Sequence, residues 1–154
     1  MGVKIIDFDK KYAQHFYDLN IEWLKSYFYV EPFDEEVLSQ PFKYIINKGG
    51  FIFFAVKADA VVGTVALMPT QKKGLLELTK LAELPEARGQ KIGQHLLQHA
   101  IDFGKVKHLN ALLLSSNTKL ENAIYLYRKY GFVELELEKD NPYERADIKM
   151  LLKL

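Results

Sequence analysis

Residues 75–93 read LLELTKLAELPEARGQKIG, and this stretch decides the predicted fold. An apolar run typical of a strand covers residues 75–84, and a glycine-bearing turn over residues 88–93 leads into an apolar helical pattern. A strand that passes through such a turn into a helix leaves backbone N–H groups free at the positive end of the helix dipole. Those donors suit a phosphate or diphosphate, although a short glycine turn before a helix is often only a turn.

The segments that follow the turn alternate between helix and strand. The helix after the turn carries one apolar stripe, and Gly104 is predicted to close it. A buried strand is predicted over residues 111–115. Residues 118–121, read as Thr-Lys-Leu-Glu, have the spacing of a capping box, and the helix they begin is predicted to run to Tyr130, with Gly131 in a left-handed conformation.

The segments before the turn and at the end of the chain complete the predicted order. A short strand, a long helix and a second helix precede a hairpin, and Asp34 is expected to cap the second helix, which Pro41 kinks or splits. Two alternating strands end the chain. In sequence order, these elements are expected over residues 3–8, 10–28, 35–47, 51–56, 61–68, 132–137 and 148–154.

The resulting order is β-α-α-β-β-β-α-β-α-β-β. Three consecutive strands before the glycine turn predict antiparallel hairpins, which a doubly wound parallel sheet does not contain. Only part of the G-x-G-x-x-G dinucleotide fingerprint is present at the turn. The predicted fold class is therefore α/β of the α+β type, with a mixed, mostly antiparallel central sheet flanked by about four helices.

Composition excludes several classes of function. The 154 residues suit a single domain over residues 1–154, and a net charge of +1 gives no basic footprint for nucleic acid. The absence of cysteine removes cysteine nucleophiles, thiolate zinc sites and disulfides. His95 and His99 stand four residues apart without an evident third ligand, so no metal site is expected. No signal-peptide pattern or spanning apolar run is found, so we expect a cytoplasmic protein without a membrane partner.

Two separated motifs carry a family resemblance. Residues 75–93, followed by residues 117–132 (NTKLENAIYLYRKYGF), resemble the GCN5-related N-acetyltransferase, or GNAT, superfamily. The first family signature is Arg or Gln, two residues, a small residue, one residue and a second small residue. The chain supplies Arg88 and Gly93 but carries Lys91 at the first small position, where we expect a helical residue whose side chain points outward. The second signature is complete over residues 126–132, LYRKYGF.

The resemblance implies that acetyl-CoA is the acyl-donor substrate. The turn would hold the coenzyme A diphosphate through backbone N–H groups, and the strand before it, which bulges and splays in the family, would pair with the pantetheine arm. A backbone N–H on that strand can polarise the thioester carbonyl. Asn117 or Asn122 would also contact the arm, and both remain candidates. The implied strand and turn residues are Leu81, Ala82, Glu83, Arg88, Gly89, Gln90, Lys91, Ile92, Gly93 and Gln94.

Tyr127 is the candidate general acid. It aligns with a tyrosine that the family often uses to protonate the coenzyme A thiolate, and a phenol is protonated at neutral pH. The alternative role is that of a core aromatic, because Leu120, Ile124 and Tyr127 form a helical stripe.

Glu77 is the candidate base, acting directly or through water. It interrupts an apolar strand, and alternation predicts that Glu77, Thr79, Leu81 and Glu83 share one face. Glu83 is the rival base, and a partly exposed carboxylate without a catalytic role is the structural alternative. The acceptor amine is mostly an ammonium ion at neutral pH and has to lose a proton before it attacks.

The expected activity is direct transfer of an acetyl group from acetyl-CoA to a primary amine of a small molecule or peptide. A transferase that uses another acyl-CoA and a catalytically silent acyl-CoA-binding or interaction domain are the alternatives. Aromatic residues of the first helix region, Trp23, Tyr27, Phe28 and Tyr29, stand where the family walls its acceptor site. Loops near residues 29–34 and 139–145 would set acceptor choice. The sequence leaves the oligomeric state open, with a homodimer as one candidate because dimers are frequent in the family.

Overall fold

The central element of the fold is a seven-stranded sheet with the order β1-β2-β3-β4-β5-β7-β6. The computed structural model describes residues 2–137 and 143–154. Neighbouring strands pair antiparallel except β4 and β5, which are parallel, so the predicted mixed, mostly antiparallel sheet is confirmed. The strands are β1 (Lys4–Asp7), β2 (Phe51–Lys57), β3 (Ala60–Pro69), β4 (Leu75–Glu83), β5 (Ala111–Ser116), β6 (Val133–Leu135) and β7 (Ile148–Lys153).

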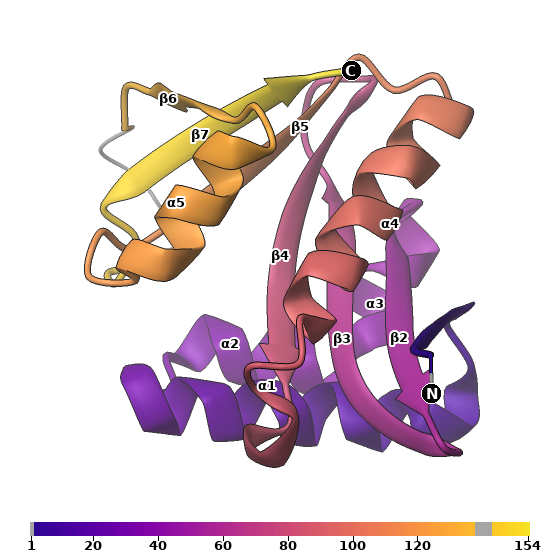
Figure 1. Cartoon of the computed structure of the whole chain (residues 1–154). Coiled ribbons are helices and arrows are strands. Elements are labelled where there is room, and N and C mark those ends of the chain that lie inside the picture. Colours follow the sequence, from indigo (N-terminus) through magenta and orange to yellow (C-terminus); the bar gives the residue numbers. More distant parts are fainter. Residues whose placement is uncertain (1, 138–142) are drawn as a thin grey trace.

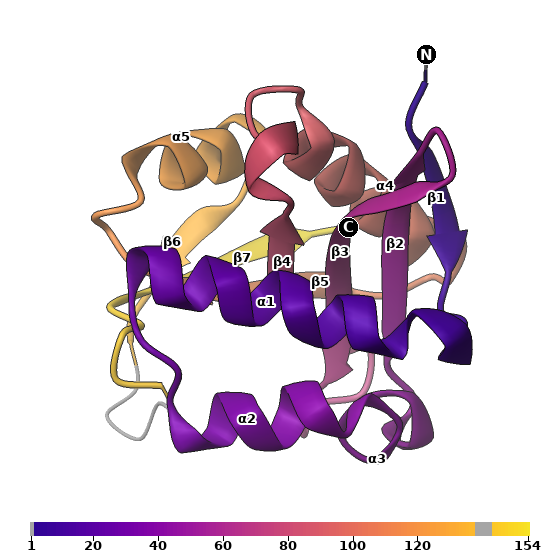
Figure 2. The same ribbon diagram turned by 90° about the horizontal axis from the view of Figure 1, so that it is seen from below.

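Helices cover both faces of this sheet. Helices α4 and α5 pack on one face, and α1, α2 and α3 lie on the other (Figure 1). Figure 2 shows α1 crossing β2, β3 and β4. The described α-helices are α1 (Ala13–Tyr27), α2 (Pro32–Ser39), α3 (Pro41–Tyr44), α4 (Ile92–Val106) and α5 (Glu121–Lys129). Single 3-10 turns span Lys10–Tyr12, Ile46–Lys48 and Pro85–Ala87. None of the described helices is long and apolar enough to cross a bilayer.

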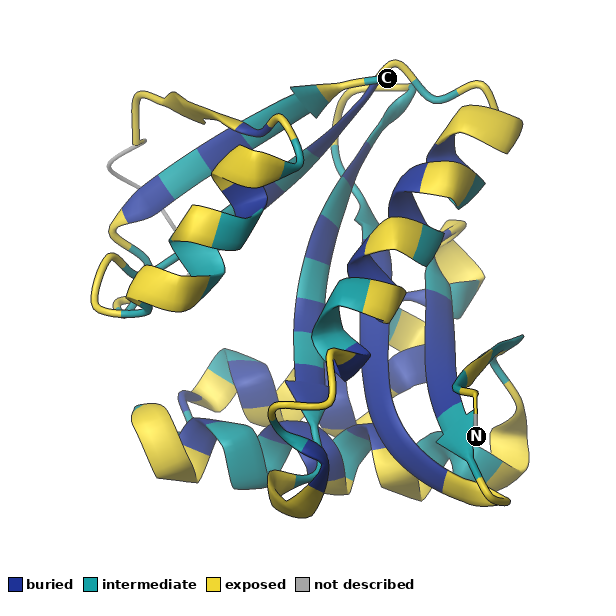
Figure 3. Ribbon diagram, in the orientation of Figure 1, coloured by how far each residue is buried: buried dark blue, intermediate teal, exposed yellow. Residues whose placement is uncertain are grey.

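Two apolar clusters, one on each face, fix the helices to the sheet. Buried side chains concentrate along the central strands and on the inner side of α4 (Figure 3). Ile92, Leu96 and Leu97 of α4 belong to the first cluster, and Phe16 and Leu19 of α1 belong to the second. Because burial of each such side chain contributes about 1.5–3 kcal/mol, these contacts fix the N-terminus of α4 against β3 and β4.

Strands β4 and β5 pair along only a short stretch. Leu75, Leu76 and Glu77 pair with residues 111–113, and the two strands separate beyond that point (Figure 1). On the β5 side, the described part of the chain therefore gives residues 78–83 of β4 no strand partner. The open edge lies beside the turn that precedes α4.

Strand β4 also contains a bulge. Ala66 pairs with Thr79 and Thr64 with Ala82, so Val65 stands opposite two residues, Lys80 and Leu81. Lys80 has a φ of 58°, in the left-handed region that lysine rarely adopts. The bulge implied by the resemblance is thus present in this strand.

The second predicted helix forms as two shorter ones. Pro41 separates α2 from α3, in agreement with the predicted kink or split. The start differs from the prediction, because Pro32 occupies the first turn and Glu31 is the N-cap. Asp34 closes a capping box by accepting a hydrogen bond from the backbone N–H of Glu31 at 2.9 Å.

Two other predicted helix boundaries are wrong. Gly104 lies inside α4, where a Cβ would come within 2.6 Å of Leu154 Cδ1, so close packing explains this glycine better than a helix end does. Thr118 does not cap α5, because its backbone N–H and its hydroxyl both bind the Asp147 carboxylate. Gly131 has the predicted left-handed conformation, with a φ of 102°.

Candidate active site

A cavity of about 1170 Å³ lies between the separated strands and helices α1, α4 and α5. One end reaches the turn before α4, where Gly89, Lys91 and Gly93 line it. The opposite end is lined by Tyr143 and Arg145, and residues of α1 also line the cavity. The lining thus runs from the turn along residues 77–83 of β4 to Tyr143 and Arg145.

The turn lines the cavity with two left-handed residues. Gly89 has a φ of 87°, and Lys91, the N-cap of α4, has a φ of 63°. Glycine adopts this conformation without a steric penalty, which accounts for the family's small residue at the position of Lys91. The prediction of a helical Lys91 is wrong, whereas its exposed side chain agrees with the expected outward direction.

The Glu83 carboxylate lies at the start of α4, where the backbone N–H of Gly93 acts to lower its pKa. A Cβ at Gly93 would lie 3.1 Å from Glu83 Oε1, so the glycine admits the carboxylate at close range. Burial raises the pKa of Glu83 above its usual value, while the Gly93 N–H and the Arg88 charge oppose that rise.

Three other turn residues use their side chains for the fold. The Arg88 guanidinium binds Glu22 Oε1 of α1 at 2.7 Å and lies over the Tyr27 ring. Gln90 Oε1 accepts a hydrogen bond from Lys57 Nζ at 2.8 Å. The Ile92 side chain is fully buried in the first cluster. The backbone N–H groups of Arg88 and Gln90 are engaged as well, because they donate to the carbonyls of Pro85 and Ala87 at 3.3 and 3.2 Å.

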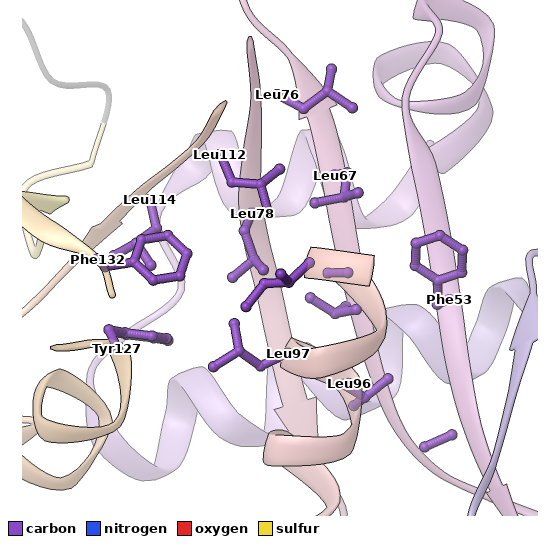
Figure 4. Close-up of a cluster of buried hydrophobic side chains, with 14 of the residues drawn as sticks. Phe53, Leu67, Leu76, Leu78, Leu96, Leu97, Leu112, Leu114, Tyr127 and Phe132 are labelled. Carbon is purple, nitrogen blue, oxygen red and sulfur yellow. The ribbon is translucent and has the colours of Figure 1, made fainter. Parts of the chain in front are cut away.

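Tyr127 lines the cavity and also belongs to the core. Its ring packs edge-on against Phe132, with Leu114 and Leu97 nearby in the same cluster (Figure 4). No described side-chain polar atom is both buried and without a hydrogen-bond partner. Because no described residue binds the Tyr127 hydroxyl, that hydroxyl opens to the cavity. Burial raises the pKa of the phenol to about 12, so it carries its proton at neutral pH.

The two candidate asparagines differ in their availability to a ligand. Asn117 holds the chain, since its Nδ2 donates to the carbonyl of Arg145 at 2.6 Å and its Oδ1 accepts from the backbone N–H of Lys119. Asn122 is exposed on α5 and lines the cavity without a side-chain hydrogen bond to any described residue. Asn122 is thus the better placed of the two to meet a ligand.

The bulge overturns the predicted common face of β4. Lys80 points to the α2 side, where it binds Asp34, and Ala82 belongs to the cluster of that side. Leu81 packs with the α4 cluster, and the Glu83 carboxylate lies against Gly93 of α4. The extra residue shifts the alternation by one, so Glu77 and Glu83 lie on opposite faces of the sheet.

Glu77 lies on the α2 side, toward the far end of the cavity. Burial raises the pKa of its carboxyl, and the charges of Lys80 and Lys149 oppose the rise. A carboxyl with a raised pKa is a better proton acceptor than an ordinary surface carboxylate. Of the two candidate carboxylates, Glu77 is therefore the one on the side of Tyr143.

A buried charged cluster beside Glu77 was not identified from the sequence. Asp34 is fully buried and accepts both hydrogen bonds of a bidentate pair with Arg145, at 2.7 and 2.8 Å, and a third from Lys80 at 3.3 Å. Burial acts to raise the pKa of Asp34, but the Arg145 hydrogen bonds and the Lys80 charge hold it below its usual value. One feature of the sequence pointed toward this cluster. The loops near residues 29–34 and 139–145 were expected to set acceptor choice, and they contain Asp34 and Arg145.

Nearly all of the predicted site residues meet at this one cavity. Gln90 and Ile92 are the two of the fourteen that do not line it. Trp23, Tyr27 and Phe28 of the expected aromatic wall line the cavity, whereas Tyr29 instead donates a hydrogen bond to Glu144. The predicted residues that line it are Glu77, Leu81, Ala82, Glu83, Arg88, Gly89, Lys91, Gly93, Gln94, Asn117, Asn122 and Tyr127.

The two histidines of α4 lie in different surroundings. His99 packs against the ring of Phe53 at 4.7 Å, and His95 is exposed. In the described ranges, 2–137 and 143–154, no group of three or more acidic or histidine residues could hold a metal ion.

Comparisons with known proteins agree with this fold. An IAA acetyltransferase of Azospirillum brasilense is 35% identical over 80 residues, which are 52% of each chain, so the match spans about half the length of that relative. Among solved structures, an acetyltransferase of the GNAT family from Staphylococcus aureus Mu50 has a TM-score of 0.86 at 21% identity, with 99% of each chain covered.

A second solved structure contains coenzyme A. The PaiA N-acetyltransferase from Thermoplasma acidophilum, in complex with coenzyme A, has a TM-score of 0.78 at 18% identity, with both chains fully covered. At these identities the likeness establishes the fold alone. The sequence pattern of the acetyltransferase (GNAT) family matches residues 11–132, most of the chain. The chain therefore belongs to the acetyltransferase (GNAT) family.

Proposed function

We propose that this chain, as a single domain over residues 1–154, transfers an acetyl group from acetyl-CoA to a primary amine. The observation that carries the proposal is the cavity, which joins the α4 donors, the open edges of β4 and β5, and the Tyr127 hydroxyl. A carrier molecule that has a diphosphate, an amide-bearing arm and a thioester, in that order, requires these three features one after another. The coenzyme A in the Thermoplasma relative supports this carrier.

The carrier would lie with its diphosphate at the turn and its arm beside residues 81–83. Backbone N–H groups of the turn and the positive end of the α4 dipole would hold the diphosphate. The unpaired edge of β4 would bind the amides of the arm as a neighbouring strand would. Asn122 is the polar side chain that α5 offers to the arm.

The reaction would proceed by direct attack. Glu77 would take a proton from the acceptor ammonium, directly or through one water, and the neutral nitrogen would attack the thioester carbonyl carbon. A backbone N–H of the bulged strand would stabilise the oxyanion, and its collapse would break the carbon–sulfur bond. Tyr127 would donate its proton as negative charge develops on sulfur, and its phenolate would take up the second proton lost by the acceptor nitrogen, directly or through water, so that a neutral amide and free thiol are released.

A thiol-release assay tests this proposal. The purified chain would be mixed with acetyl-CoA and a panel of small amines and peptides that carry primary amino groups, and free thiol would be measured. Release with at least one amine, together with the matching acetylated product by mass spectrometry, is expected. Release only with longer acyl-CoA donors would assign another acyl group, and binding of acetyl-CoA without release from any donor would support a silent acyl-CoA-binding domain.

A further inference from the structure

The bulged residue of β4 is a lysine whose side chain turns away from solvent. Lys80 combines a left-handed backbone, with a φ of 58°, and a side chain that is only 4% exposed. A left-handed lysine inside a strand is uncommon and persists only where its surroundings hold it. Burying an ammonium group is also unfavourable unless it is paired. The left-handed backbone and the buried ammonium group both require contacts that stabilise them.

Two groups anchor the Lys80 ammonium. Nζ lies 3.3 Å from Asp34 Oδ1 of α2 and donates to the Tyr143 hydroxyl at 2.7 Å. The same ammonium stands 4.4 Å from the centre of the Tyr143 ring, and the Arg145 guanidinium stands 4.4 Å from that ring as well. The Tyr143 ring therefore contacts both cations that bind Asp34.

Asp34 is held independently of Lys80. The α2 capping box fixes its carboxylate, and Arg145 binds both of its oxygens. Arg145 also binds Glu31, the N-cap of α2, at 3.0 Å. Helix α2, the bulge and residues 143–145 are consequently joined by one buried network, and Asp34 retains two charged hydrogen bonds if Lys80 is removed.

We propose that Lys80 is a positioning residue for the acyl-transfer reaction. Its ion pair with Asp34 holds the β4 bulge in the conformation that turns the backbone of residues 81–83 toward the bound thioester. Through Tyr143 and Arg145, the same ion pair also joins strand β4 to the residues that line the opposite end of the cavity. The strand and these residues then form one rigid unit. This inference rests on the proposed function, because it assumes that acetyl-CoA occupies the cavity.

The alternative, that Lys80 itself takes the proton or the acetyl group, fits the contacts less well. Two of its three donor positions are directed at Asp34 and Tyr143, and the side chain is almost completely enclosed. Substitutions at Lys80 separate these roles. Lys80→Gly removes the amine but tolerates a positive φ without an anchor, whereas Lys80→Met removes the amine and keeps the backbone strain. Lys80→Arg retains a cation that can reach Asp34.

The carbonyl of bound acetyl-CoA reports on the bulge directly. Acetyl-CoA labelled with carbon-13 at the thioester carbonyl would be added to each variant, and the carbonyl signal of the complex would be recorded by NMR. A hydrogen bond from the bulge shifts that signal away from its position in free acetyl-CoA. We expect Lys80→Met to lose at least half of the wild-type shift, and Lys80→Gly and Lys80→Arg to retain most of it. Circular dichroism would verify that each variant folds.

The pH dependence gives a second readout. Burial lowers the pKa of Lys80 to about 8, and the charges that face it are Asp34, Arg145 and Glu77, with the Tyr143 phenol in contact. Deprotonation above pH 8 removes the ion pair with Asp34. The wild-type carbonyl signal should therefore move toward the Lys80→Met position between pH 7 and pH 9, and the signal of Lys80→Met should not follow.

The matched control is Lys153→Met, which alters an exposed strand lysine on β7. It should leave the carbonyl shift unchanged. Two results would overturn the inference and leave the proposed function in place. One is an identical carbonyl shift in wild type and Lys80→Met, and the other is an equal loss of the shift in Lys80→Gly and Lys80→Met. Failure of the wild-type chain to bind acetyl-CoA overturns the proposed function, and this inference with it.

Discussion

The Glu83 carboxylate lies against the backbone of Gly93 at the point where α4 begins, with Oε1 3.1 Å from the position of a Cβ on that glycine. An acidic side chain thus lies among the backbone donors expected to bind a diphosphate. The carboxylate carries the same sign of charge as that ligand, so the two compete for the positive end of the helix dipole.

Removing this charge should strengthen coenzyme A binding. Glu83→Gln keeps the size of the side chain, and a charge at a helix N-terminus contributes about 0.3–1 kcal/mol, so the dissociation constant should fall about two- to fivefold. Isothermal titration calorimetry measures this change. Pantetheine lacks the diphosphate, and its affinity should be the same for both proteins. Weaker coenzyme A binding by Glu83→Gln would show that the carboxylate supports the site.

The same competition predicts a pH effect of known sign. Burial raises the pKa of Glu83, so its carboxyl gains a proton at a higher pH than an ordinary glutamate does. The Glu83 carboxylate therefore competes with the coenzyme A diphosphate above that raised pKa, and the competition is lost as the pH falls through it. The ratio of coenzyme A affinities between Glu83→Gln and wild type should therefore approach one in acid, and calorimetry at several pH values would follow it. A ratio that grows as the pH falls would contradict this account.

Loss of the Tyr127 hydroxyl should slow turnover rather than weaken binding. Tyr127→Phe preserves the ring contact with Phe132 but removes the proton donor, and general acids typically contribute about 10²–10⁴-fold. The maximal rate of thiol release should fall by about that factor, with acetyl-CoA affinity changed by less than about threefold. Tyr130→Phe is the matched control at the end of the same helix, and unchanged turnover in Tyr127→Phe would assign the residue to the core alone.

Relief of the left-handed backbone at Lys91 should stabilise the protein slightly. Lys91→Gly removes a strain of about 1 kcal/mol but frees the unfolded chain, so the net gain should be about 0.5 kcal/mol. Urea unfolding measures it, and coenzyme A affinity should change by less than about threefold, because the backbone donors stay. A large gain in affinity would show that the Lys91 side chain obstructs the diphosphate.

Breaking the buried Asp34 pairs should be much more damaging. Asp34→Asn leaves Lys80 and Arg145 with one fewer charge partner, and such losses typically destabilise a protein by about 3–5 kcal/mol. Because the folded-state pKa of Asp34 is lowered, its stabilising contribution is present above its unfolded pKa and is lost as the pH falls through the folded value. Urea unfolding of Asp34→Asn should show the full loss at neutral pH, whereas Asp102→Asn, exposed on α4, should show almost none.

The central part of the fold was predictable because its signals are local. Two continuous apolar runs joined by a four-residue connection identified the β2–β3 hairpin, and the turn before α4 and Gly131 were recognisable from glycine positions and motif order. Helix ends were less predictable, because tertiary contacts compete with local caps. Asp147, from a distant segment, takes the hydroxyl of Thr118 that local spacing assigned to a capping box.

The candidate site was predictable where its donors are backbone groups and less so where they are side chains. One extra residue at Lys80 moved Leu81 and Glu83 to the opposite face from Glu77, and alternation alone gives no sign of a bulge. The Asp34 cluster joins residues 46 and 111 positions apart, so its pairing depends on the completed fold. The spacing of residues along the sequence does not indicate such contacts.

The brief pairing of β4 with β5 also bears on hydrogen exchange in the middle of the sheet. Three residue pairs connect the part of the sheet that contains β1–β4 with the part that contains β5–β7. Amide groups along the unpaired edges should exchange their hydrogens readily without a ligand, and a carrier arm seated between them would supply hydrogen-bond partners. Hydrogen exchange would then slow along both edges together, so the carrier would serve as an eighth strand as well as a substrate.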